Sequence, residues 1–147
     1  MIKLKRLIGG FALALWLFAA GAGTAVSGDY FVLVANVDNE VTSINRVQAE
    51  RMFLGKKRRW PDGKKASVII NENPEIYESF SHTVLRRSPH QFLNFRKKML
   101  FRGQGMPPPT VKTDRDVIEF VAGHVGGLGY VDPEAVTLAV KIISISQ

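Results

Sequence analysis

The chain alternates between apolar runs of strand length and segments in which apolar residues recur at helical spacing. Residues 30–37 form an almost continuous apolar and β-branched run. A run of this kind predicts a strand that is buried on both faces of a sheet. Residues 66–71, 128–131 and 136–145 have a similar character and predict three further strands.

Helix-start signals lie between these predicted strands. Asn73 and Ser88 each precede a proline, so a capping side chain is followed by a residue whose missing N–H costs nothing in the first helical turn. Thr113 precedes an acidic first turn, which the helix dipole favours. Thr42 or Ser43 is predicted to cap a helix that ends at the next glycine.

Strands and helices therefore alternate along most of the chain, which is the pattern of an α/β protein. We predict a three-layer fold with a mixed, mainly parallel sheet and helices on both faces. The proline-rich residues 106–109 predict an extended connector, and no repeat or low-complexity segment divides the chain. The part that follows the leader described below has the length of one ordinary domain, which we place at residues 28–147.

The first residues have the pattern of a secretory signal peptide. Lys3, Lys5 and Arg6 precede the apolar residues 7–20, and small residues follow at 21–25. Cleavage after residue 25 or after residue 27 satisfies the small-residue rule. The apolar run is shorter than the about 20 residues that a membrane-spanning helix needs. We therefore predict a periplasmic protein that does not span the membrane after cleavage; an uncleaved anchor is the alternative.

The chain carries a formal net charge of +7, and its cations gather in one loop. Removing the three basic residues of the leader leaves seventeen basic against thirteen acidic residues, so the exported chain is only weakly basic. Nucleic acid is therefore not a predicted partner. Gly55 and the Trp60–Gly63 turn predict a surface loop that contains most of a cationic group: Lys56, Lys57, Arg58, Arg59, Lys64 and Lys65.

Residue patterns that carry catalysis or hold a metal are weak in this chain. His82, His90 and His124 fall on separate predicted elements without a second ligand at metal-binding spacing, and the chain has no cysteine. The glycine-rich residues 123–129 follow a helix and enter a strand, which is the reverse of a dinucleotide-binding turn. We predict a protein that is not an enzyme and that uses no metal or cofactor.

Several short motifs, in their order along the chain, resemble the phosphate-binding proteins of ABC transporters, and most closely the short, single-lobe relatives of that family. The resemblance implies one lobe of a type II periplasmic binding protein, export, and a link to phosphate or another small oxyanion and to an ABC transporter permease. The motifs are Met52–Lys56, Trp60–Gly63, Phe80 with Val84–Leu85, Phe101–Pro108, Val117–Ile118 and Gly127–Val131.

The sequence departs from that family at the element that holds phosphate. Full-length members carry an Arg-x-x-x-Ser-Gly-Thr element after the second strand, whereas Pro74, Glu75 and Ile76 stand at the Ser-Gly-Thr positions here. No arginine lies within residues 66–77. The family's phosphate ligands therefore cannot be transferred to this chain, and only one lobe is present.

If the chain captures a solute, the carboxyl end of the second predicted strand is the expected site, because free N–H groups at helix starts face a ligand there. The predicted donors are the side-chain amides of Asn71 and Asn73, the backbone of residues 73–76 including Glu75 and Ile76, and the helix-start residues Thr42, Ser43 and Thr113. The alternative is an envelope interaction module that has lost this site and uses the basic loop to contact an acidic protein or anionic lipid.

Overall fold

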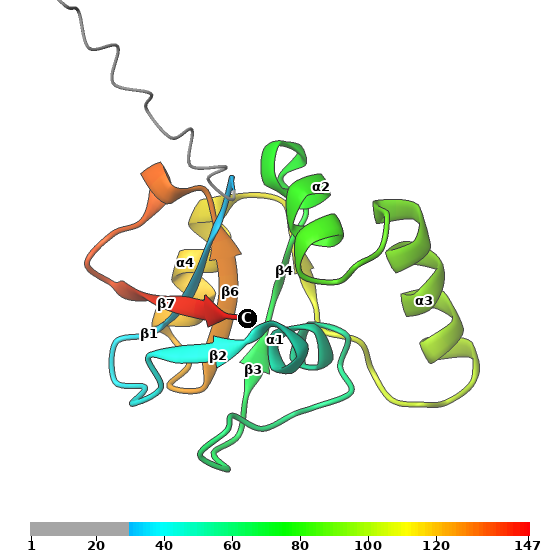
Figure 1. The fold of residues 1–147 in the computed structure, drawn as a ribbon, viewed down its shortest axis with the longest axis horizontal. Coiled ribbons are helices and arrows are strands. Elements are labelled where there is room, and N and C mark those ends of the chain that lie inside the picture. Colours follow the sequence, from blue (N-terminus) through cyan, green and yellow to red (C-terminus); the bar gives the residue numbers. More distant parts are fainter. Residues whose placement is uncertain (1–29) are drawn as a thin grey trace, which may run out of the picture.

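The computed structural model describes residues 30–147, so the predicted signal peptide lies outside the described residues. A five-stranded sheet forms the centre of the molecule, in the order β2-β7-β1-β6-β3 (Figure 1). A second sheet contains only β4 and β5. The strands are β1 (Val32–Asn36), β2 (Ser43–Asn45), β3 (Ser67–Val68), β4 (Ile70–Asn71), β5 (Thr110–Val111), β6 (Gly127–Val131) and β7 (Val140–Ser146).

Strand β1 is the central strand, as its apolar sequence predicted. It pairs antiparallel with β6, where Leu33 lies opposite Tyr130, and antiparallel with β7, where Leu33 lies opposite Ile143. The outer pairs β2–β7 and β3–β6 are parallel, as is β4–β5. The predicted mixed α/β sheet is confirmed.

Within residues 30–147, four α-helices and one short 3-10 helix connect the strands. The predicted caps Asn73, Ser88 and Thr113 are confirmed, since each side chain accepts a hydrogen bond from a backbone N–H in the first helical turn. The last strand begins later than predicted, because the 3-10 helix and a turn come first. The helices are α1 (Arg46–Phe53), α2 (Pro74–Thr83), α3 (Pro89–Phe101), α4 (Asp114–Ala122) and η1 (Pro133–Ala135).

The prediction that Thr42 or Ser43 caps the first helix is wrong. Asn45 is the cap, and its side chain and that of Gln48 each accept a hydrogen bond from the other residue's backbone N–H. The residues before this cap form β2, whose three residues pair with the end of β7. Pairing with a strand about one hundred residues away extends the backbone here and delays the helix start.

The predicted strand over residues 66–71 is interrupted at Ile69. The N–H of Ile69 donates to Leu128 in the large sheet, at 3.0 Å, whereas the N–H of Ile70 donates to Pro109, at 2.9 Å. The chain therefore leaves one sheet and enters the other within two residues. This crossing brings the end of β4 next to the start of α4.

Two apolar clusters cover the two faces of the large sheet, which gives the predicted three layers. Leu33 and Ala35 of β1 point into the larger cluster, together with side chains of α1, α2 and α3. Val34 points to the opposite face, where it joins Val117 and Val121 of α4. Alternate residues of one strand thus serve both cores.

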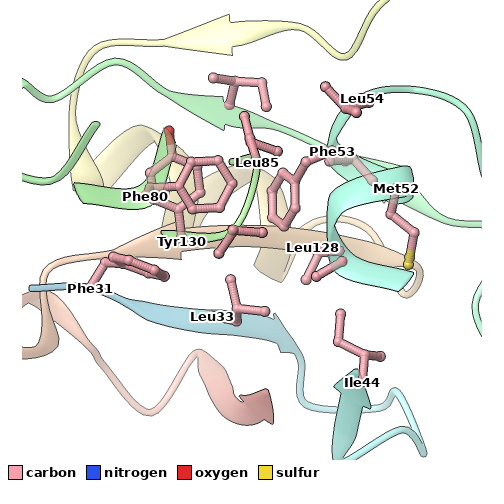
Figure 2. Close-up of a cluster of buried hydrophobic side chains, with 14 of the residues drawn as sticks. Phe31, Leu33, Ile44, Met52, Phe53, Leu54, Phe80, Leu85, Leu128 and Tyr130 are labelled. Carbon is pink, nitrogen blue, oxygen red and sulfur yellow. The ribbon is translucent and has the colours of Figure 1, made fainter. Parts of the chain in front are cut away.

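Aromatic side chains fill the larger cluster. The rings of Phe80 and Tyr130 stack with centroids 3.6 Å apart and an interplanar angle of 7°. Phe53 meets the Phe80 ring edge to face, with the centroids 4.8 Å apart. Figure 2 shows these three side chains above Leu33 of the central strand. Tyr130 is therefore both a core residue and, through its hydroxyl, a neighbour of the β4 end.

The loop after α1 has the predicted turn geometry. Gly55 has a φ of 75°, the left-handed conformation expected after a helix end. The N–H of Gly63 donates to the carbonyl of Trp60 at 2.9 Å and closes the turn. The Trp60 side chain is buried, and its Nε1 donates to the carbonyl of Gly126 at 2.9 Å. The tryptophan anchors an otherwise exposed loop to the sheet.

Within residues 30–147, no helix is long and apolar enough to cross a membrane.

Candidate functional site

The expected solute site lies where β4 ends and where α2 and α4 begin. The Nδ2 atom of Asn71 donates to Asp114 Oδ1 at 2.6 Å, and Nδ2 of Asn73 donates to the same oxygen at 3.3 Å. Asp114 is the first residue of α4. The two predicted amide donors are therefore brought together, but an internal carboxylate already accepts from both.

The Asn71 side chain has no remaining donor for a ligand. It is fully buried, and besides its bond to Asp114, Nδ2 donates to the carbonyl of Tyr130 at 3.1 Å. Its Oδ1 accepts from the backbone N–H of Asn73 at 2.9 Å. Every polar atom of this amide is thus used within the fold, which is the expected state of a buried amide.

The backbone N–H groups at the start of α2 are also satisfied. Pro74 has none, the N–H of Glu75 donates to Asn73 Oδ1 at 3.2 Å, and the N–H of Ile76 donates to the Asn73 carbonyl at 3.2 Å. The Glu75 side chain is exposed, and the Ile76 side chain is in the core. The predicted backbone donors therefore have internal acceptors.

Of the remaining predicted solute ligands, Thr113 lies at this position, whereas Thr42 and Ser43 do not. Thr113 caps α4, with its Oγ1 accepting from the N–H of Asp116 at 3.2 Å and lying 2.7 Å from the Asp116 carboxylate. Thr42 and Ser43 belong to the edge of the large sheet, where the Thr42 carbonyl accepts from the N–H of Ser144. The expectation that these two residues are helix-start donors is wrong, because Asn45 caps the helix, which begins at Arg46.

Tyr130 completes this polar cluster, and sequence reasoning missed it. Its hydroxyl donates to the carbonyl of Asn71, and the residue is fully buried. Burial, with a smaller contribution from the charge of Tyr77, raises the pKa of Tyr130 well above its ordinary value of 10.0. The phenol is therefore a permanent hydrogen-bond donor at physiological pH. Asp114 was also missed, since only the adjacency of β4 and α4 brings it to Asn71.

The cations of the predicted basic loop line two different hollows. A cleft of about 720 Å³ lies between the loop and α3, and we call it the α3 cleft. Its lining includes Phe95 and Met99 of α3. Four of the six cations predicted to form one surface line this cleft: Lys56, Lys57, Arg58 and Arg59.

The other two cations, Lys64 and Lys65, line a different hollow, although Lys65 lies opposite Arg59 across the loop. Lys64 is 3.1 Å from Glu40 and 3.9 Å from Asp62. With Lys65 and Asp38 it lines a separate, smaller hollow beside Trp60. Acidic neighbours therefore offset the charge of this second group.

The titratable residues do not form a metal-binding group in the part of the chain that the structure describes. No group of three or more histidine, aspartate or glutamate side chains within residues 30–147 could hold a metal ion. His82, His90 and His124 are exposed.

Comparison with known proteins identifies the fold. No protein-family model and no curated protein matches this chain. Similar solved structures include an ABC-type phosphate transport receptor from Vibrio cholerae, with 18% identity and a TM-score of 0.55. An ABC transporter substrate-binding protein from Clostridium perfringens, solved with bound phosphate, has 13% identity and a TM-score of 0.59. PstS from Borrelia burgdorferi has 17% identity and a TM-score of 0.57.

The length of each match indicates a single lobe. These similarities cover 78%, 78% and 80% of this chain, in the same order, but only 45%, 44% and 47% of the receptors. The chain thus spans less than half the length of each receptor. The resemblance seen in the sequence motifs is confirmed at the level of the fold: the chain has the fold of one lobe of a phosphate-receptor-type binding protein.

Proposed function

We propose that this chain is an exported, non-enzymatic docking module that binds another envelope protein rather than a small oxyanion. One observation carries the proposal. The carboxylate of Asp114 accepts hydrogen bonds from the side-chain amides of both Asn71 and Asn73, the groups that an oxyanion at this position would need.

Electrostatics favour the internal carboxylate over an added anion. An oxyanion within reach of the two amides would lie about 4 Å from the Asp114 carboxylate, where two like charges near a protein surface repel by about 4 kcal/mol. A hydrogen bond from a neutral amide to a charged group is worth about 1.5–3 kcal/mol, but each bond to the oxyanion would replace one that the amide already makes to the Asp114 carboxylate, so the exchange returns little. Glu75, two positions after Asn73, adds negative charge, whereas Glu72 is offset by Arg96 at 3.7 Å. The position therefore disfavours phosphate.

Capture of phosphate or another oxyanion for ABC-type uptake is the second candidate. Its support is the fold shared with phosphate receptors, one of them solved with bound phosphate. In this case Asp114 would have to move away from the two amides, and the partner would be a transporter permease. The amides of Asn71 and Asn73 would then be the ligands.

Calorimetry of the processed chain with phosphate and sulfate separates the two candidates. A docking module gives no binding heat at millimolar anion. Micromolar binding that disappears in the Asn73→Asp variant would reject the docking proposal in favour of solute capture. Asn45→Asp is the matched control, because Asn45 also caps a helix but lies at α1. This variant should behave as the wild type does with either anion.

A further inference from the structure

We infer that the α3 cleft binds an acidic, extended peptide segment that carries an aromatic or aliphatic side chain. The inference rests on the proposed docking function and states the chemistry of the partner. It assigns the contact to a concave surface shared by two elements rather than to the basic loop alone. Lys56, Lys57, Arg58 and Arg59 come from the loop, and Phe95 and Met99 come from α3.

The cations of the cleft lack acidic partners. Within residues 30–147, no carboxylate lies within salt-bridge distance of Lys56, Lys57, Arg58 or Arg59. Four adjacent cations that are close together repel one another, so an acidic ligand relieves this repulsion as well as forming new ion pairs. Charge complementarity therefore selects an acidic occupant.

A second hollow extends the same surface along α3. It has a volume of about 610 Å³ and shares Phe95 with the α3 cleft. Its lining includes Arg86, Arg87 and Lys98, and its one carboxylate, Glu50, already pairs with Arg87 at 3.1 Å. The cationic surface is thus long enough to follow several residues of an extended chain.

An aromatic ring in the middle of this surface explains the expected apolar side chain. Phe95 is half-buried, with Lys56 Nζ and Arg87 Cζ each 5.4 Å from its ring centroid. The two cations lie against the Phe95 ring. The ring itself lines both hollows and so marks the place where they meet. Met99 and Gly55 extend the apolar lining on the loop side. A peptide with acidic residues on both sides of one apolar side chain matches this order.

The concave shape favours a peptide over a lipid surface. Phe95 and Met99 line a hollow, and Met99 is buried, with 5% of its surface exposed. A flat membrane meets the rim of such a hollow but does not reach its floor, whereas a single extended strand of peptide does.

Fluorescence anisotropy of the processed chain with a labelled acidic peptide tests the inference. The probe is a decapeptide of alternating aspartate and glutamate with one central phenylalanine, measured beside a version with serine at that place. We expect micromolar binding that weakens with salt, and weaker binding of the serine version. The double variant Lys56→Glu with Lys57→Glu should bind about tenfold more weakly or worse, because two attractions become repulsions.

The chain provides a matched control for this variant. Lys64→Glu with Lys65→Glu makes the same change in net charge but lies outside the cleft, and its affinity should stay within about twofold of the wild type. Lys98→Glu, on α3, should weaken binding independently of any effect on the loop. Circular dichroism verifies that each variant is folded.

Several outcomes would overturn the inference: no peptide binding, equal losses in the two double variants, or binding only to phosphatidylglycerol vesicles. None of these results bears on phosphate binding. Conversely, micromolar phosphate affinity would reject the docking function while leaving the peptide measurements intact. The two failures are therefore distinguishable.

Discussion

Replacing Tyr130 with phenylalanine tests how the end of β4 is held in place. The Tyr130 hydroxyl donates to the Asn71 carbonyl from a fully buried position, and its ring stacks on Phe80. Phenylalanine keeps the ring but leaves that carbonyl without this donor. A lost buried hydrogen bond of this kind costs about 1–2 kcal/mol, and we expect the free energy of unfolding at pH 7 to fall by that amount.

The difference in stability between the wild type and the Tyr130→Phe variant should depend on pH. Burial raises the pKa of Tyr130 above 10.0, so the folded chain keeps a proton that the unfolded chain loses. The associated stability is complete below pH 10 and falls as the pH rises above 10, by about 1.4 kcal/mol for each pH unit while the folded state stays protonated. Tyr130→Phe lacks this loss, so its stability should equal that of the wild type near about pH 11.

Urea unfolding followed by circular dichroism at pH 7, 9, 10 and 11 measures this crossing. Tyr30→Phe is the control, because Tyr30 is 75% exposed and should show neither change. Tyr77 is present in all three proteins, so its contribution to the pH dependence cancels when their stabilities are compared. A stability difference that stays constant from pH 7 to 11 would refute the argument that the fold holds the Tyr130 proton. Equal stabilities at pH 7 would refute the role of its hydrogen bond.

Three further substitutions test other contacts. Asn36→Ala should cost about 1–3 kcal/mol in urea unfolding, because the buried Asn36 amide donates to the Val121 carbonyl at the end of α4. Gly126→Ala should lower the melting temperature by several degrees, since a Cβ there would lie 2.1 Å from the Lys65 carbonyl oxygen. Burial alone would raise the pKa of Glu50, but arginine hydrogen bonds outweigh it and lower the pKa below 4.5. The stability that ionised Glu50 contributes is therefore present above pH 4.5 and is lost as the pH falls below it. The Glu50→Gln variant lacks this loss, so its stability should fall less in acid than that of the wild type, by a difference of less than about 1 kcal/mol.

Local chemistry made much of the fold predictable. Asn73, Ser88 and Thr113 cap their helices through bonds to residues two or three positions away, so short sequence windows contain the whole signal. The prediction that Thr42 or Ser43 caps a helix was wrong because the structure of this segment depends on a distant part of the chain. That segment becomes a strand only because the end of β7 lies beside it.

Long-range contacts also determine the candidate site. The bond between Asn71 and Asp114 joins residues 43 positions apart, and it exists because the chain leaves the large sheet at Ile69 and enters the β4–β5 pair. No local pattern marks Asp114 as more than a helix-start acid. The sequence therefore located the amides correctly but could not show that a carboxylate already accepts from them.

The distribution of charge links the closed site to the open cleft. Residues 30–147 contain two groups of potential anion-binding donors discussed above, and Asp114 satisfies the one at the end of β4 from within. On the side of α3, residues 86–112 contain seven lysine and arginine residues and no aspartate or glutamate. The loop cations of the α3 cleft face this same side. A modest net charge is thus concentrated where acidic residues are scarce, so we expect an anionic partner to be attracted to α3 rather than to the end of β4.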